Sequence, residues 1–190
     1  MTLTDPRRGI VAAMAALSRE TGVHVDGEVV ASRLGPPLEV ELAAWFPAAE
    51  VDAAAGLFRA LYPEHAVPAT VALPGAVEAV ALVRGSGARA VVVTAKMYEL
   101  AVATLAHVGI VADEVVGWRW GPGKGETLCE HGATAYVGDH VADVDGARIA
   151  GAVSVAVASG PCSAEELRAC GADVVLGDLG EFPAWWKMAG

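Results

Sequence analysis

Five short apolar runs constrain the fold of this chain more than any other feature. The first, ARAVVVT (88–94), is too short for a helix and is apolar on both faces, as buried parallel strands are. Helical patterns separate it from four similar runs, DEVVG (113–117), ATAYVGD (133–139), AVSVAVAS (152–159) and ADVVLGD (172–178). This alternation of strand and helix predicts an α/β fold with a doubly wound parallel sheet.

The region before residue 73 has a different texture, because helical patterns fill residues 10–66 and no strand-like alternation appears there. Ile10, Met14 and Leu17 form one apolar stripe, and Gly22 ends that helix. Three more helical segments follow (26–35, 36–46 and 50–65). We therefore expect an α/β core of residues 1–9 and 72–190, with residues 10–71 inserted as a helical subdomain.

Composition and charge exclude several classes of protein. Of the 190 residues, 54% are hydrophobic and 19% charged, which excludes a disordered chain. The net charge is −10 without any basic block, so nucleic acid and anionic membranes are not expected partners. No signal-peptide pattern appears, and the apolar runs are far shorter than the ~20 residues of a membrane span. The three cysteines lack CxxC spacing. We expect a cytoplasmic protein with reduced cysteines.

Polar residues follow several of the predicted strands at their carboxyl ends. Thr94 ends the first run, Asp139 ends the third with Asp143 four residues later, and Ser159 ends the fourth. Lys124 follows the glycines of GPGKG, before the third strand. In an open parallel sheet, ligands bind beyond the carboxyl ends of the strands. These residues are therefore expected to converge on one edge of the sheet.

The residue types at this edge suit a metal ion and a phosphoryl group. Two carboxylates, Asp139 and Asp143, form a hard-oxygen site that favours Mg²⁺. A hydroxyl (Thr94), exposed backbone amides and one lysine (Lys124) suit phosphoryl oxygens. Each residue alone is an ordinary turn, cap or surface residue, but together they favour metal-assisted phosphoryl transfer.

Other candidates are weaker. Lys96 is interpreted either as a second phosphate contact or as a solvated lysine, and His140 as a substrate contact or, more simply, a turn residue. Four tryptophans, Trp118, Trp120, Trp185 and Trp186, are interpreted as packing residues rather than a base-stacking platform, since the chain is acidic. The sequence indicates no oligomeric state.

With these motifs in place, the chain resembles the haloacid dehalogenase-like hydrolases, in particular the phosphoglycolate phosphatase-like branch with a helical cap. VVVTAK (91–96) is similar to the second motif of that family, GKGETL (123–128) to the third and VGDHVADVDGARIAG (137–151) to the fourth. RLGPPLEVEL (33–42) resembles the cap, and LPGAVEAVALVRGSGA (73–88) the return into the core.

The resemblance implies a role for each matching residue. Asp139 would bind Mg²⁺, and Asp143 would complete or orient its coordination. Thr94 and the amide of Ala95 would hold phosphoryl oxygens, while Lys124 would neutralise charge in the transition state. The helical segment would close over the site as a cap.

The first motif of that family, a strand ending in Asp-x-Asp-Gly-Thr-Leu, is matched only from its Thr-Leu onward, by Thr2 and Leu3, with Met1 in place of Gly. Its two aspartates, the nucleophile and the general acid–base, would lie before Met1. By resemblance, the missing strand would run centrally, between the strands ending at Thr94 and Asp139. We expect Met1 to be an internal methionine of a longer natural chain, and the 190 residues to be inactive.

The resulting hypothesis is a Mg²⁺-dependent phosphatase acting on a small phosphorylated metabolite through an aspartyl-phosphate. Substrate selection is expected from Arg33, Leu34, Pro36 and Pro37 of the cap. One alternative is a non-catalytic relative that binds phosphate or a partner. Another is a different chemistry of the same family, such as dehalogenation or phosphonate cleavage, which Lys124 and the Asp139/Asp143 pair fit less well.

Overall fold

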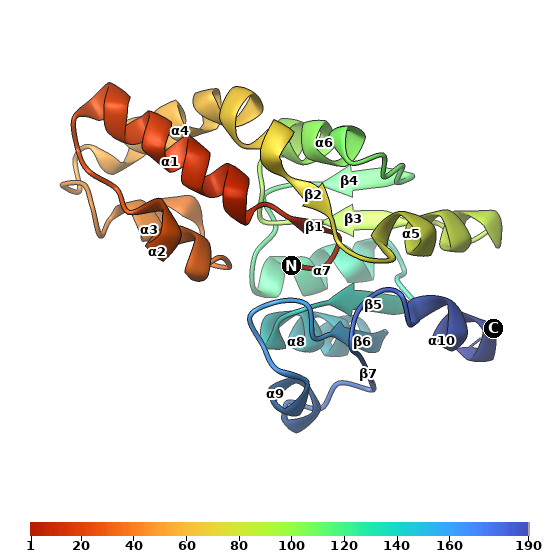
Figure 1. Cartoon of the computed structure of the whole chain (residues 1–190). Coiled ribbons are helices and arrows are strands. Elements are labelled where there is room, and N and C mark those ends of the chain that lie inside the picture. Colours follow the sequence, from red (N-terminus) through yellow and green to blue (C-terminus); the bar gives the residue numbers. More distant parts are fainter. Residues whose placement is uncertain (190) are drawn as a thin grey trace. The chain divides into compact units, whose positions relative to one another are not determined.

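The computed structural model describes residues 1–189, and it has the α/β architecture expected from the sequence. All five predicted strands are present, with helices between them (Figure 1). They are β3 (Val91–Val93), β4 (Glu114–Val116), β5 (Ala135–Gly138), β6 (Val153–Val157) and β7 (Val174–Leu176). Two further strands of two residues each, β1 (Thr4–Asp5) and β2 (Val71–Ala72), pair with one another and were not predicted.

The five predicted strands are parallel, but they form two separate sheets. β3 pairs with β4, with Val92 opposite Val115. β5 pairs with β6, and β6 with β7, in a second sheet. Among residues 1–189, β3 and β5 thus each have a single strand neighbour (Figure 1).

The chain divides into two compact units. One contains residues 1–4, 72–98 and 109–190, and we call it the α/β unit; the other contains residues 5–71 and 99–108, and we call it the helical unit. The predicted division placed residues 99–108 in the core, whereas this segment, most of helix α6 (Tyr98–His107), groups with the helical unit.

The helical unit contains the predicted succession of helices. They are α1 (Arg7–Thr21), α2 (Gly27–Ser32), α3 (Leu38–Leu42) and α4 (Val51–His65), followed by a 3-10 turn at Val67–Ala69. α1 ends at Gly22, which adopts the left-handed conformation (φ 72°). α2 begins at Asp26, whose carboxylate accepts hydrogen bonds from the amides of Glu28 and Val29. α1 packs against α2 and α4, and buries Met14 and Leu17.

Helices of the α/β unit connect its strands. They are α5 (Ala76–Gly85), α7 (Pro122–Glu130), α8 (Val141–Ala150), α9 (Ala164–Ala169) and α10 (Phe182–Ala189). A core cluster joins Val144 of α8, Ala156 of β6 and Leu167 of α9. β6 is buried at four of its five positions, as its uninterrupted apolar sequence predicts. Within residues 1–189, no helix combines the length and apolar character that crossing a membrane requires.

Candidate active site

The candidate site lies in the α/β unit, at the carboxyl ends of its parallel strands. Thr94 follows β3, and Asp139 follows β5. α8 begins two residues after Asp139 and carries Asp143 in its first turn, while Lys124 lies in the first turn of α7. Hydrogen bonds connect Lys124, Asp143 and the turn after β5, whereas Thr94 lies at the end of the other sheet.

Asp139 is a buried carboxylate with a cationic neighbour. Its Oδ1 accepts a hydrogen bond of 2.6 Å from the Thr2 hydroxyl, and its Oδ2 forms an ion pair with the α-amino group of Met1. The hydroxyl of Ser159 donates to the Met1 carbonyl at 3.0 Å, which fixes this segment beside the end of β6. Asp139 therefore attracts positive charge at the sheet edge.

Asp143 receives four hydrogen-bond donors. The Lys124 ammonium group (2.6 Å) and the Tyr136 hydroxyl (3.3 Å) donate to its Oδ1. Backbone amides of Asp139 (3.1 Å) and His140 (3.2 Å) donate to its Oδ2. A carboxylate offers about four lone-pair sites, so these donors use the capacity of Asp143. In this arrangement Asp143 orients Lys124 and the turn that bears Asp139.

Two glycines allow the carboxylates to lie this close to the backbone. A Cβ atom on Gly138 would lie 2.3 Å from the Cβ of Asp143, and one on Gly160 would lie 2.0 Å from Oδ2 of Asp139. Neither distance is sterically possible. Glycine is therefore required at both positions for the observed side-chain placement, and Gly160 belongs to the loop after β6.

Tyr136 is a site residue that the sequence analysis missed. It lies on β5 two residues before Gly138, so both face the same side of the strand and both adjoin Asp143. Burial raises the pKa of the Tyr136 hydroxyl well above its ordinary value, and the Asp143 charge adds to this effect. The phenol remains a hydrogen-bond donor at neutral pH. The sequence signal that could have identified Tyr136 is its position two residues before Gly138, which places both on the same side of the strand.

Thr94 is connected to α7 through one arginine. The Thr94 carbonyl accepts a hydrogen bond of 2.9 Å from the amide of Arg119, whose side-chain Nε donates to the Thr127 hydroxyl of α7 at 3.0 Å. The Thr94 hydroxyl accepts from the amide of Lys96 (3.2 Å). No hydrogen bond described for residues 1–189 joins Thr94 or Ala95 directly to Lys124, Asp139 or Asp143. Lys124, Asp143 and Asp139 form one hydrogen-bond network. Thr94 is connected to the helix that carries Lys124 through the two hydrogen bonds of Arg119.

The residues fit a magnesium ion held mainly by Asp139. Mg²⁺ is commonly bound by one or two carboxylates together with water and substrate phosphate. The α-amino group of Met1 forms an ion pair with Asp139, so this carboxylate accepts a cation. Within residues 1–189, no group of three or more His, Cys, Asp or Glu side chains is arranged around a possible metal position.

The remaining candidates differ in their surroundings. His140 caps α8, where its Nδ1 accepts from the amide of Ala142 at 3.1 Å, as a turn residue would. In α10, Trp186 stacks with Phe182 and Trp185 lies at a tilted angle to the same ring, which confirms their packing role. The packing interpretation is wrong for the other two tryptophans, because Trp118 (53%) and Trp120 (51%) are about half exposed. Both lie in a glycine-flanked loop that offers no helix or strand face to bury them.

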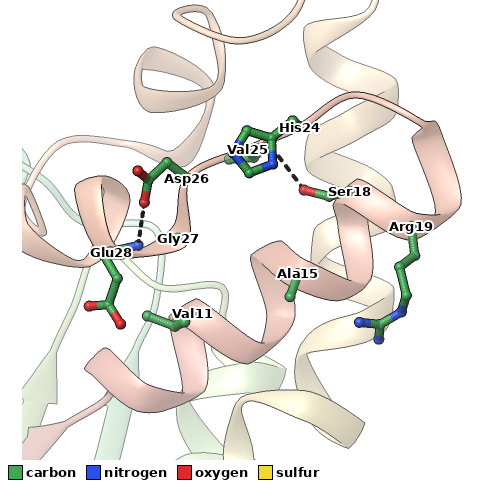
Figure 2. Close-up of a pocket in the computed structure, with 9 residues that line it drawn as sticks. All are labelled: Val11, Ala15, Ser18, Arg19, His24, Val25, Asp26, Gly27 and Glu28. Atoms are coloured by element: carbon green, nitrogen blue, oxygen red, sulfur yellow. Dashed lines mark hydrogen bonds between the residues drawn. The ribbon is translucent and has the colours of Figure 1, made fainter.

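A hollow lies within the helical unit, between α1 and the segment that leads into α2 (Figure 2). Its polar groups are already engaged in local structure. The Ser18 hydroxyl accepts from the amide of Val25 at 2.9 Å and donates to the Met14 carbonyl, and Asp26 caps α2. Arg19 lies apart from these groups in Figure 2. The hollow therefore shows no converging catalytic set.

Comparisons with known proteins agree on one family. A family model described as haloacid dehalogenase-like hydrolase matches residues 1–148. A protein named Probable phosphatase IndB, from Dickeya dadantii, is 28% identical over 200 residues, which cover 95% of this chain and 87% of that protein.

Solved structures share the fold. A haloacid dehalogenase-like family protein from Streptococcus pneumoniae is 21% identical with a TM-score of 0.80, over 97% of this chain and 93% of that one. A hydrolase from Deinococcus radiodurans, solved with bound phosphate and sodium, is 19% identical with a TM-score of 0.68, over 99% and 92%.

Proposed function

Because this chain belongs to the haloacid dehalogenase-like hydrolase family, we propose that it has the phosphate site of a Mg²⁺-dependent phosphatase that acts on a small phosphorylated metabolite. The observation that carries the proposal is the network of Lys124, Asp143 and Asp139 at the end of β5. It holds one cation and two buried carboxylates at the edge where ligands of parallel sheets bind.

In this proposal Asp139 holds the metal. Mg²⁺, when bound, supplies positive charge that polarises the phosphoryl oxygens. Asp143 has its lone pairs occupied by four donors, so its role is to orient the Asp139 turn and Lys124 rather than to bind the metal directly. The bound sodium and phosphate named for the Deinococcus radiodurans hydrolase are in keeping with a cation and an anion at such a site.

Lys124 and Thr94 act on the phosphate. The Lys124 ammonium group, held by Asp143, neutralises negative charge that develops as the phosphoryl group transfers. The Thr94 hydroxyl and the amide of Ala95 hold phosphoryl oxygens at the end of β3. These groups are positioned before substrate arrives, which lowers the reorganisation that the reaction requires.

The attacking group is the part that these residues do not supply. The chain has a single Asp-x-Asp sequence, Asp143–Asp145, and it lies inside α8, with the Asp145 side chain 62% exposed. In the family an aspartate that ends a central strand attacks phosphorus and becomes an aspartyl-phosphate. We therefore expect the 190 residues by themselves to bind phosphate without turning it over, and we expect the cytoplasm as their location.

The structure also offers support for a second candidate, a non-catalytic protein of the same fold that binds phosphate or a partner. The single strand neighbours of β3 and β5 leave backbone groups on both that another strand can pair with. This candidate retains the phosphate site and differs from the first only in lacking turnover under every condition.

An activity assay distinguishes the two. Phosphate release from a panel of small phosphomonoesters is measured with and without Mg²⁺, for the 190 residues and for the same chain preceded by an apolar strand ending in Asp-x-Asp. The proposal predicts Mg²⁺-dependent turnover in the preceded chain alone, lost in Thr94→Val and Lys124→Met. If the 190 residues turn over substrate as fast as the preceded chain, and this turnover depends on Thr94, the mechanism is contradicted. If neither protein turns over any substrate, the non-catalytic candidate is favoured.

A further inference from the structure

The loop between β4 and α7, residues 117–121, is pressed against the candidate phosphate-binding segment. The amide of Trp118 donates to the Lys96 carbonyl at 3.0 Å, and the amide of Arg119 donates to the Thr94 carbonyl at 2.9 Å. A Cβ atom on Gly117 would lie 2.6 Å from the amide nitrogen of Tyr98, so the two segments are in close contact. This loop, which we call the tryptophan loop, therefore borders the end of β3.

The tryptophan loop is also fixed from its other side. The Nε of Arg119 donates to the hydroxyl of Thr127, which is a buried residue of α7, the helix that carries Lys124. The Trp120 carbonyl accepts from the amide of Gly123 in the first turn of the same helix. Contacts to both the β3 end and α7 hold this loop at the candidate site.

This fixed loop carries two large aromatic side chains that are partly exposed. Trp118 and Trp120 are about half exposed, although both indoles are large apolar groups that normally bury most of their surface. Trp118 has φ of 57°, and it is the one residue other than glycine with positive φ in residues 1–189. A bulky side chain is strained there, and glycine would relieve the strain. Strained backbone and exposed aromatic groups beside a site indicate a binding role.

We propose that Trp118 and Trp120 form a platform for the organic part of the substrate, and that this part carries a planar aromatic or heteroaromatic ring. The inference rests on the proposed function, because the phosphate site at Thr94 and Lys124 would place the ring beside the loop. Indole faces stack well on planar rings. The net charge of −10 and the engagement of Arg119 with Thr127 favour a small ligand over a nucleic acid strand.

Two esters that differ only in the ring test the platform. Phenyl phosphate and cyclohexyl phosphate both carry a six-carbon ring on a phosphate dianion, but only the first ring is planar. Their dissociation constants are measured by calorimetry on the 190-residue chain with Mg²⁺. We expect phenyl phosphate to bind about tenfold more tightly, as base–aromatic stacking does. Equal affinities for the two esters would overturn the platform.

Substitutions in the tryptophan loop test whether its two indoles cause the preference for phenyl phosphate. Trp118→Ala and Trp120→Ala are each expected to reduce it severalfold, whereas Val111→Ala, which removes another exposed apolar side chain, leaves it unchanged. Trp118→Gly also loses the preference but melts at a higher temperature than Trp118→Ala, since glycine tolerates positive φ. A preference that survives in the tryptophan variants would overturn the assignment, as would an alanine variant that melts at the temperature of the glycine variant.

A further variant separates this inference from the proposed function. Lys124→Met is expected to weaken both esters by the same factor, because it acts on the shared phosphate. If Lys124→Met weakens the binding of both esters, but the parent chain binds the two esters equally well, only the platform is overturned. If neither ester binds the parent chain, the proposed function is overturned, and the platform with it.

Discussion

The ammonium nitrogen of Lys124 lies 2.6 Å from Oδ1 of Asp143, and the two side chains are 18% and 7% exposed. The pair joins the first turn of α7 to the first turn of α8, so it fixes the relative placement of two segments that border the sheet edge. Both charged groups are largely shielded from water. Removing either one would therefore leave the other buried without a counter-charge.

Replacing Asp143 by asparagine should therefore destabilise the protein. Asp143→Asn removes the negative charge beside Lys124 and places an amide where four donors converge. We expect a loss of about 3 kcal/mol in the free energy of unfolding, measured by urea denaturation. The control is Asp145→Asn on the same helix, whose exposed pair with Arg148 should contribute under about 0.5 kcal/mol. Similar losses in the two variants would contradict this account.

A methyl group at Gly160 should disturb Asp139 specifically. The added Cβ of Gly160→Ala would lie 2.0 Å from Oδ2 and 2.5 Å from Cγ of Asp139, so that carboxylate must move. We expect Mg²⁺ to raise the melting temperature of the parent chain and to have no such effect on Gly160→Ala. Gly85→Ala serves as the control, because no atom lies within 4 Å of its added Cβ. A full Mg²⁺ response in Gly160→Ala would argue against Asp139 as the metal ligand.

His131 should make stability depend on pH. Its Nε2 lies 3.0 Å from Oε1 of Glu114, and this hydrogen bond raises the pKa of His131 and lowers the pKa of Glu114. The stabilisation is present below the unfolded histidine pKa of about 6.5 and is lost as pH rises through the higher folded value. It is also lost in acid, as pH falls through the folded pKa of Glu114.

Urea denaturation of the parent chain and His131→Gln at pH 5.5 and 8.5 measures this effect. The parent chain should exceed the variant in stability more at the lower pH than at the higher one. A difference that is the same at both pH values would show that the histidine charge contributes nothing.

Removing the Tyr136 hydroxyl should have a modest effect on stability and a clearer effect on the site. Tyr136→Phe deletes one donor to Asp143 and leaves the ring to pack, so we expect a loss of about 1 kcal/mol in urea denaturation. Phosphate affinity should fall as well, since Lys124 shares the same oxygen of Asp143. Unchanged phosphate affinity would limit Tyr136 to a structural role.

Periodicity predicted the parts of the fold that have enough residues to show a pattern. All five apolar runs became strands, and the four helical segments before residue 66 became helices. β1 and β2 were missed because two residues carry no period. Residues 99–108 show an amphipathic helix, but sequence alone does not indicate with which unit a helix groups.

For the candidate site, the sequence indicated some of the residues that lie near one another but not the contacts that they make. The four-residue spacing of Asp139 and Asp143 brings the two together, since the Asp139 amide donates a hydrogen bond of 3.1 Å to Oδ2 of Asp143. Which lone pairs remain available on Asp143 depends on donors from β5 and α7, which the local sequence does not reveal. Trp118 and Trp120 were misjudged because a glycine-flanked loop has no periodicity from which to infer burial.

Phosphate binding by the 190-residue chain tests the central claim most directly. Calorimetric titration with inorganic phosphate, with and without Mg²⁺, should show binding that requires the metal and weakens at least tenfold in Thr94→Val and in Lys124→Met, in line with the loss of a charge-assisted hydrogen bond. Phosphate binding of equal strength in the parent chain and both variants would contradict a site built from the ends of β3 and β5 and the start of α7.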